Sequence, residues 1–552
     1  MKCTSVILSI LTIFCQAVYS QNENSNVRSI KLSPNNSRIA LDSNKTREFF
    51  KSQLKIPANY EFRNQIVKGR NGQTRDTCGL GYVHEHYEQY YKGIKIEHFD
   101  IRTHYWNDSL VYVNGEYIDA QTIDTAVIIS IDTAIQRAIT FIGAKKYMWE
   151  DENNWLRSID TSIKSLYPKY EVVICKNSMN SKDTMFYIAY KIDVFAKEPL
   201  SHNYVYVDAK TGKVLALNAI LVNANGTAET RYSGTQNITT TYDQNLNLYA
   251  LRDYTRGNGI ETYNLKGSTL INESMSHAVD FTNSTNDWDF SDENNPLYIH
   301  HGILDAHWGA MMTYDYFKNI HNRNSYDNDN GVIRGYVHYG TNHANAYGGG
   351  KWNLMVYGDG DGIKQNIFTS LDIVAHEFGH CVSFHTADFE YPAQPWIPYE
   401  ESASISEGMS DIWAACVKNH VNNLLPGLNK DVWLHGADVG IPYGTLARSL
   451  SNPKGLGYPD TYDGDNWSGG SNSTYYSLSP HSNGVVFGHW FYILCIGKIG
   501  QNDKGWNYNV TGIGISKAEK IIYRALTVYM TKNTNFQDAR IYTIIIALNN
   551  CG

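Results

Sequence analysis

The chain has 552 residues, of which 42% are hydrophobic and 13% aromatic, and this composition excludes a disordered chain. Its 13 Pro and 43 Gly exclude a low-complexity or collagen-like chain, and its formal net charge of −8 argues against a nucleic-acid-binding protein. At roughly 150 residues per domain, a folded chain of about three or four domains is expected.

Residues 1–20 have the pattern of a secretory signal peptide. An apolar segment at 6–14 is followed by Val18 and Ser20, which suit cleavage before Gln21. The segment is too short to span a bilayer, and no later segment has 18 consecutive apolar residues. We therefore expect a secreted, extracellular protein with no stable membrane insertion; an N-terminal core helix is the alternative.

The cysteines outside the signal peptide show neither metal-ligand spacing nor a dense disulfide framework, so we expect them to be small buried hydrophobic residues. They are Cys78, Cys175, Cys381, Cys416, Cys495 and Cys551.

Residues 29–220 alternate short apolar and polar runs, which indicates a strand-rich region. The runs at 204–207 and 214–217 flank a turn that contains Gly212, and this pattern predicts an antiparallel hairpin. One helix is predicted at 133–141. Because no His, Cys and carboxylate residues cluster in this half, we expect an α+β accessory region.

A polar segment at 223–227 indicates a linker, and the composition changes after it. Residues up to about 361 are rich in Gly, Asn, Asp and Tyr, which indicates short strands, with one helix near 306–320. From Thr369 onward helical periodicity dominates. The sequence therefore predicts a strand-rich lobe followed by a helical lobe, with the chemistry where they meet.

The segment 376–380 reads His-Glu-Phe-Gly-His, a pattern typical of zinc peptidases. At 100° per residue, His376 and His380 lie one turn apart on the helix face opposite an apolar stripe. Two imidazoles so placed can share one cation at roughly 2.0–2.1 Å from each nitrogen. The alternative is a pair of solvated or core histidines. The apolar stripe consists of Leu371, Val374, Ala375, Phe378 and Val382.

A catalytic zinc ion needs a third protein ligand and an open fourth position. On the predicted helix around 405–413, Glu407 and Asp411 lie together opposite an apolar face. One carboxylate for the metal, and a second to hold a histidine N–H group, is a common arrangement in such sites. A solvated helix carboxylate is the alternative for Glu407.

Six ordered sequence blocks between about 227 and 549 together resemble the thermolysin family of secreted zinc metalloendopeptidases. The blocks are 305–307 with 313–316, 355–362, 372–380, 406–411, 448–453 and 481–484. In the front half, His84, Gln89, Tyr91 and Gly93 resemble the family's propeptide module, and 207–215 resembles the end of a PepSY module.

The resemblance implies an α+β fold: a thermolysin-like two-lobed zincin preceded by an α+β propeptide region. It implies a propeptide module at 21–125 that resembles the fungalysin/thermolysin propeptide, and a PepSY-like module at 126–222. The strand-rich lobe is expected at 223–372 and the helical lobe at 373–552. The expected partners are a protein or peptide substrate and the protein's own propeptide, which would aid folding and block the cleft. A monomer that binds no nucleic acid is expected.

Transferred position by position, the family implies one catalytic Zn²⁺ on His376, His380 and Glu407. Asp411 would orient His376, and Glu377 would be the general base. The zinc would activate water and polarise the peptide carbonyl, and Glu377 could pass the proton to the leaving amine.

On the substrate side, the family implies that His481 hydrogen-bonds the oxyanion and that Arg448 binds a substrate carbonyl. Asn345 and the Ala346 carbonyl would contact the substrate backbone. A second oxyanion donor, a Tyr, is assigned to Tyr399, which is one residue off register in a 27-residue gap between His380 and Glu407 that is longer than usual.

Several positions depart from the family pattern. Ser406 replaces an Asn, Tyr476 stands where an Asp would orient His481, and the chain ends at Gly552, where the family usually continues. These departures keep two alternatives open, namely a catalytically impaired zinc-binding protein of this fold and another zinc hydrolase such as an aminopeptidase.

Calcium is the second metal that the family implies. Its paired-calcium site uses an Asp matched by Asp372, but the other carboxylates fall here on Lys418, Leu434 and Ala437. Since Ca²⁺ requires hard oxygen ligands, the double site is expected to be absent. The acidic loop 359–361 could hold a single Ca²⁺ or form a turn, and the same alternatives apply to 287–292.

Ile373, on the histidine face, and Ile367 suggest an apolar pocket beside the zinc. Ala447 stands where the thermolysin family has a larger apolar residue, and this difference would widen the pocket. A preference for a bulky hydrophobic residue after the scissile bond is therefore expected.

Overall fold

The computed structural model describes residues 27–32, 42–65, 74–78, 81–150, 166–180, 182–198, 200–271, 275, 277–289, 301–350, 353–389, 401–445, 447–468 and 479–549. The expected signal peptide lies outside these ranges. Among the described helices, none combines the length and hydrophobicity needed to cross a lipid bilayer. Cys175, Cys381, Cys416 and Cys495 are buried free thiols, as predicted, whereas the side chains of Cys78 and Cys551 lie outside the described part.

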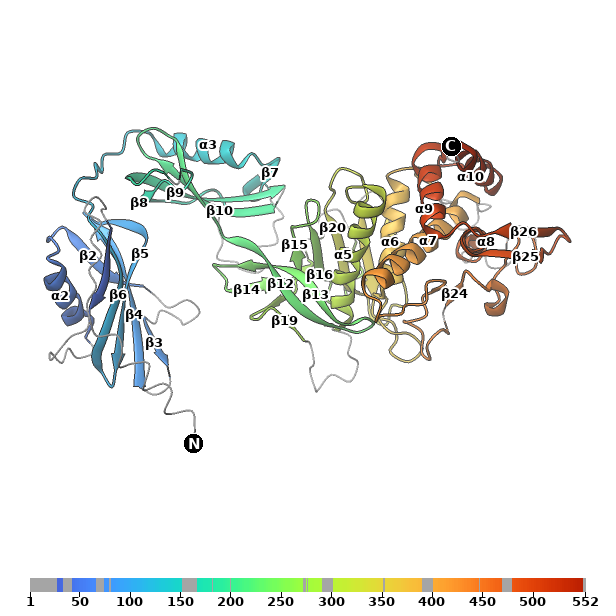
Figure 1. Ribbon diagram of the computed structural model, residues 1–552, viewed down its shortest axis with the longest axis horizontal. Helices are drawn as coiled ribbons and strands as arrows, with labels where there is room; N and C mark the ends of the chain where they lie inside the picture. The colour runs from blue at the N-terminus through green and yellow to red at the C-terminus, as the bar shows by residue number, and fades with distance from the viewer. Residues whose placement is uncertain are drawn as a thin grey trace. The chain divides into compact units, whose positions relative to one another are not determined.

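By its internal contacts the chain divides into two compact units (Figure 1). The first comprises 1–151, 165–221 and 245–247, and the second comprises 152–164, 222–244 and 248–552.

The first unit is a mixed sheet with two helices, α2 (Ser43–Leu54) and α3 (Ile131–Ile142). α3 begins after Ser130, whose side chain accepts a hydrogen bond from the Thr133 amide, and it ends at Gly143 in the left-handed conformation. The predicted helix at 133–141 is therefore confirmed. The predicted hairpin is confirmed as the antiparallel pair β10–β11. The strands are β1 (Val27–Leu32), β2 (Tyr60–Asn64), β3 (Arg75–Cys78), β4 (Tyr82–Tyr91), β5 (Ile94–Trp106), β6 (Ser109–Ile118), β7 (Lys146–Tyr147), β8 (Tyr170–Lys176), β9 (Phe186–Glu198), β10 (Leu200–Asp208) and β11 (Val214–Ala219).

The second unit begins with a strand-rich lobe whose strands pack against α5 (His301–His321). The linker expected at 223–227 is wrong, because these residues belong to β12 (Leu221–Thr230), which pairs with β13 and β19. Hydrogen bonds to the neighbouring strands pair the backbone groups of this polar segment, and Gly226 allows Asn286 to approach closely. The other strands are β13 (Gly234–Asp243), β14 (Leu248–Ala250), β15 (Arg252–Asp253), β16 (Ile260–Asn264), β17 (Val279–Asp280), β18 (Thr282–Asn283), β19 (Asp287–Trp288), β20 (Ile333–Tyr339), β21 (Ala346–Gly349) and β22 (Leu354–Gly358).

The helical lobe follows, as predicted, and its two central helices are α6 (Leu371–Phe384) and α7 (Glu401–Leu424) (Figure 1). α6 packs against α5, α7 and β21, so His376 and Glu377 on its histidine face are also buried, whereas His380 is partly exposed. The remaining elements are β23 (Leu434–His435), β24 (Arg448–Ser449), α8 (Ser479–Ile496), β25 (Gly497–Gln501), β26 (Asn507–Thr511), α9 (Ile515–Arg524) and α10 (Phe536–Asn549).

Two glycines allow neighbouring elements to approach α6 and α7 closely. A Cβ on Gly408 of α7 would lie 2.4 Å from the Gly484 carbonyl oxygen of α8, so only glycine permits this helix crossing. A Cβ on Gly348 of β21 would lie 2.2 Å from the Glu377 carbonyl oxygen of α6. These contacts set α8 beside Glu407, and β21 beside Glu377.

Candidate metal centre and substrate cleft

Three potential metal ligands converge from α6 and α7. The Nε2 atoms of His376 and His380 lie 3.0 Å apart. The Glu407 carboxylate lies 3.3 Å from His376 Nε2 and 3.7 Å from His380 Nε2. Ligand atoms arranged tetrahedrally around zinc at ~2.0–2.1 Å would be separated by roughly 3.3 Å. The spacing and the two-imidazole, one-carboxylate donor set therefore fit a zinc ion.

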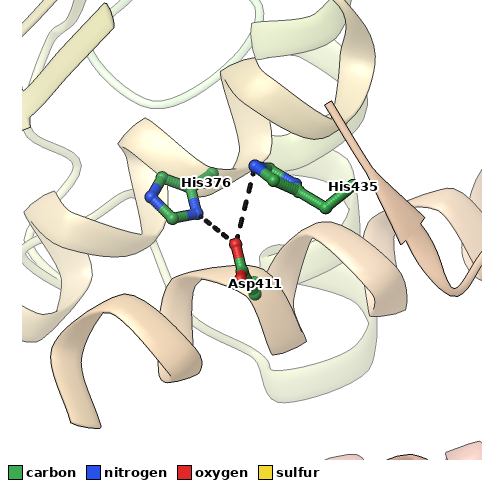
Figure 2. A group of neighbouring side chains, drawn as sticks. All are labelled: His376, Asp411 and His435. Atoms are coloured by element: carbon green, nitrogen blue, oxygen red, sulfur yellow. Dashed lines mark ion pairs between the residues drawn. The ribbon is translucent and has the colours of Figure 1, made fainter. Parts of the chain in front are cut away.

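The second nitrogen of each imidazole also has a partner. Asp411 Oδ1 lies 2.9 Å from His376 Nδ1, and Figure 2 shows this contact from α7. The hydroxyls of Ser406 and Ser410 lie 3.4 and 3.2 Å from His380 Nδ1. These contacts fix the orientation of both rings and leave each Nε2 directed at the common point.

Burial and neighbouring charges shift the pKa values of these groups. Burial raises the pKa of Glu377 to about 7, with Glu407 adding to the effect and His376 opposing it. Burial lowers the pKa of His376, but hydrogen bonds to Asp411 and Glu407 outweigh this and raise it to about 10. Burial lowers the pKa of His380 to about 4. Burial opposes ionisation of Glu407, but the surrounding imidazoles hold its pKa well below the usual range.

A cleft of about 550 Å³ opens beside this group and is lined by Glu377, Arg448 and His481. Asn345 and Ala346 line its strand-rich side, where β21 is the edge among the described strands of its sheet. The apolar part of the lining comprises Phe368, Ile373, Val439, Phe384 and Phe389.

The prediction that Ile367 lines the pocket is wrong, because the structure places Phe368 in the cleft instead. Ile367 is 1% exposed and packs in the core, where a Cβ on Gly302 would lie 2.3 Å from it. Ala447 is buried and does not belong to the described cleft lining.

Arg448 and His481 reach the ligand group from β24 and α8. The Arg448 guanidinium donates two hydrogen bonds to Asp411, at 2.9 and 2.6 Å. His481 Nε2 lies 3.4 Å from the Glu407 carboxylate, and the His481 side chain is 47% exposed to the cleft. Tyr399 and Tyr476 lie outside the described residues.

His435 is a cleft residue that the sequence did not reveal. Its Nε2 lies 3.5 Å from Asp411 Oδ1, and its ring lies 4.9 Å from that of His376 (Figure 2). It pairs with Arg448 across the β23–β24 ladder. No motif surrounds His435, so only the long-range strand pairing brings it to the site.

His376, Asp411 and His435 form a second group with metal-ligand geometry. This group is a poorer candidate for zinc because Arg448 already neutralises its carboxylate and His376 would bind through Nδ1.

Comparison with known proteins gives a consistent result along the chain. Residues 225–383 match the family described as "Thermolysin metallopeptidase, catalytic domain", and 397–552 match "Thermolysin metallopeptidase, alpha-helical domain". Residues 73–117 match "Fungalysin/Thermolysin Propeptide Motif".

Among its relatives, the chain is 30% identical over 493 residues to thermolysin from Alicyclobacillus acidocaldarius subsp. acidocaldarius, covering 84% of this chain and 79% of the relative. It is 33% identical over 372 residues to bacillolysin from Brevibacillus brevis, covering 66% and 61%. The solved precursor of protealysin, a metalloproteinase from Serratia proteamaculans, is 23% identical and covers 52% of this chain and 81% of its own, with a TM-score of 0.38.

Proposed function

Since the chain belongs to the thermolysin family of zinc metalloendopeptidases and carries the family's propeptide motif, we propose that His376, His380 and Glu407 hold its catalytic zinc. The observation that supports this most directly is the short spacing of the ligand groups: the two Nε2 atoms lie 3.0 Å apart, and the Glu407 oxygens lie 3.3 and 3.7 Å from them. All three line a cleft, as a hydrolytic site requires, with His376 and Glu407 buried and His380 partly exposed.

A bound zinc ion would polarise the peptide carbonyl and lower the pKa of water. In the proposed mechanism, Glu377 accepts the proton from the attacking water and delivers it to the leaving amine. It is placed for this role because it follows His376 directly in α6 and lines the cleft. His481, which also lines the cleft, donates a hydrogen bond to the developing oxyanion.

Arg448 has a double role in this proposal. Asp411 accepts hydrogen bonds from Nε and Nη2, whereas a guanidinium carries five N–H donors. The remaining donors can bind a substrate carbonyl while the ion pair keeps the guanidinium in place. Tyr399 is retained as the proposed second oxyanion donor.

We propose that the substrate binds as an extended strand along β21. An edge strand offers unpaired backbone groups to a peptide, and Asn345 with the Ala346 carbonyl would provide such contacts. Beside the ligand group, Phe368, Ile373 and Val439 offer an apolar pocket for a bulky hydrophobic residue after the scissile bond.

We further propose that the enzyme is secreted as a monomeric zymogen, with signal peptide 1–20 and a pro-region at 21–222 that includes a PepSY-like module at 126–222. The pro-region would assist folding and block the cleft, and the peptidase would comprise the lobes 223–372 and 373–552. N-terminal sequencing of the secreted protein tests this division. Cleavage inside β12 or α5 that left full activity would contradict it.

The substitution Glu377→Gln tests the function itself. It removes the proton acceptor at nearly constant shape, so casein hydrolysis should fall by about 10²–10⁴-fold while zinc stoichiometry stays at wild type. Asp329→Asn, at an exposed carboxylate of the same unit, is the matched control and should leave both values unchanged.

Three results would refute the proposal. Unchanged hydrolysis in Glu377→Gln would refute the mechanism. Full zinc in the wild-type protein without chelator-sensitive cleavage would favour an inactive binding protein. Cleavage confined to free N-termini, with N-acetylated peptides resistant, would indicate an aminopeptidase.

A further inference from the structure

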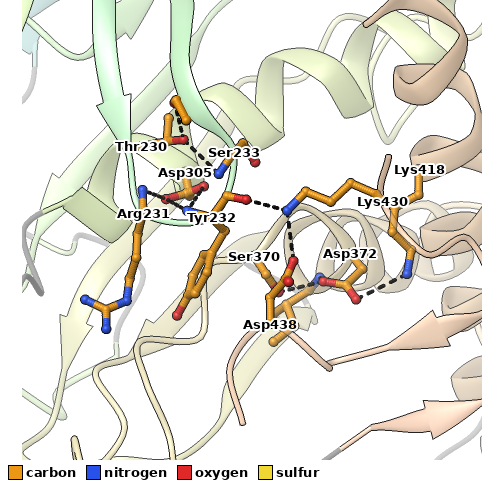
Figure 3. A network of polar contacts seen from close by, with 12 residues as sticks. Thr230, Arg231, Tyr232, Ser233, Asp305, Ser370, Asp372, Lys418, Lys430 and Asp438 are labelled. Atoms are coloured by element: carbon orange, nitrogen blue, oxygen red, sulfur yellow. Dashed lines mark hydrogen bonds and ion pairs between the residues drawn. The ribbon is translucent and has the colours of Figure 1, made fainter. Parts of the chain in front are cut away.

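Two lysines line a polar cavity that includes Asp372 at the start of α6 (Figure 3). The cavity has a volume of about 140 Å³, and Lys418 and Lys430 both line it. The Lys418 side chain is 4% exposed and that of Lys430 is 10% exposed. Since a lysine is almost never fully buried without partners, the contacts of both ammonium groups require an explanation.

Lys418 joins α7 to the first turn of α6. Its ammonium lies 3.4 Å from Asp372 Oδ2 and donates a 2.7 Å hydrogen bond to the Leu434 carbonyl. Asp372 also accepts hydrogen bonds from the Ser370 hydroxyl at 2.6 Å and the Gly436 amide at 2.8 Å. The ammonium therefore connects α7, α6 and the β23 segment at one point.

Lys430 makes the equivalent connection to the strand-rich lobe. Its ammonium pairs with Asp438 at 2.9 Å and donates to the Tyr232 carbonyl in the β12–β13 turn. The Tyr232 amide in turn donates to Asp305 of α5, at 3.2 Å. Figure 3 shows these contacts as one continuous chain from the turn to the cavity.

The cavity does not suit the paired calcium ions that the resemblance implies at Asp372. Calcium takes six to eight oxygen ligands, several of them carboxylates. Three aspartates line the cavity, and the carboxylates of Asp372 and Asp438 are each neutralised by an ammonium group, whereas exposed Asp431 accepts a hydrogen bond from the Trp433 amide. A divalent ion would have to displace two buried positive charges from their partners.

We propose that the ammonium groups of Lys418 and Lys430 perform the structural role of bound cations in this cavity. They neutralise Asp372 and Asp438 and hold α6, α7 and the β12–β13 turn together. The peptidase unit therefore takes up no calcium in this cavity, and the cavity stabilises the fold without calcium. The inference concerns stability and is independent of whether the cleft hydrolyses peptides.

Thermal unfolding of the full-length, zinc-loaded protein tests this inference, with calcium varied and zinc held constant. A site saturated 100-fold above its Kd would raise Tm by roughly 5 °C. We expect calcium to shift the Tm of the wild-type protein by less than about 1 °C on the same scale. A larger shift that Asp372→Asn abolishes would overturn the proposal.

Substitutions at Lys418 test the same inference by removing or reversing the buried positive charge. Lys418→Met should lower Tm by several degrees without rescue by calcium, whereas Lys418→Glu should lower Tm and regain it when calcium is added. Lys517→Met, at an exposed lysine of α9, is the control and should unfold like wild type. If Lys418→Met is as stable as this control, the proposal is wrong. Should Lys418→Met fail to fold, Lys430→Met, at the more exposed lysine, provides the same comparison.

Discussion

Asp411 connects the proposed metal centre to Arg448, and removing its carboxylate should impair both. The side chain is 1% exposed and contacts His376 Nδ1 at 2.9 Å and Arg448 at 2.9 and 2.6 Å. Asp411→Ala would leave the Arg448 guanidinium, 15% exposed, without its counter-charge. Breaking a buried pair in this way typically costs about 3–5 kcal/mol. Loss of the contact that orients a metal-binding histidine typically lowers metal affinity by about 10–100-fold.

The two effects can be separated by a second substitution. Asp411→Ala/Arg448→Met removes both charges, so stability should partly recover, whereas zinc affinity should not. We would measure zinc affinity by competition with a chromophoric chelator, and stability by calorimetry of the zinc-dependent transition. A Glu377→Gln background prevents autolysis. Zinc affinity within twofold of wild type in Asp411→Ala would refute the orienting role, and equal instability of both variants would refute the ion-pair argument.

Three further substitutions test the helix packing, the pocket and a buried carboxyl group. Gly408→Ala would press a Cβ against the Gly484 carbonyl, so we expect a loss of about 1–3 kcal/mol and slower casein hydrolysis; an unchanged Tm would contradict the close crossing. Val439→Phe should fill the pocket and lower kcat/KM at least about tenfold for peptides with Leu or Phe after the scissile bond, and less for Ala; equal losses would rule out this pocket. Burial raises the pKa of Asp305 from 3.8 to about 7, although hydrogen bonds from two backbone amides oppose this shift. The protonated Asp305 side chain therefore contributes its full stabilisation below pH 3.8, and this stabilisation is lost as the pH rises through 7. Relative to wild type, Asp305→Asn should therefore gain up to about 4 kcal/mol between pH 4 and 8, and a pH-independent difference between the two proteins would contradict this.

The sequence predicted the ligand helices because their information is local. His376 and His380 share a face through the i, i+4 spacing, and Glu407 and Asp411 share one in the same way. The two-lobed order followed from the change of hydrophobic period near Thr369. These features depend on neighbours within one or two helical turns.

The contacts that complete the site were not predictable in this way. The Arg448–Asp411 pair spans 37 residues, and His435 reaches the site through strand pairing with Arg448. The sequence does not reveal the contact of Ser410 with His380, because a serine near a histidine has no distinctive spacing. The Asn- and Gly-rich segment 223–227 has the composition of a linker, but pairing with β13 and β19 overrides its local preference.

Anomalous diffraction at the zinc absorption edge tests the central claim most directly. The three-ligand arrangement predicts one strong peak within ~2.0–2.1 Å of His376 Nε2, His380 Nε2 and a Glu407 oxygen. A peak between His376 Nδ1, Asp411 and His435 instead, or no peak in crystals of catalytically active protein grown with zinc, would contradict it.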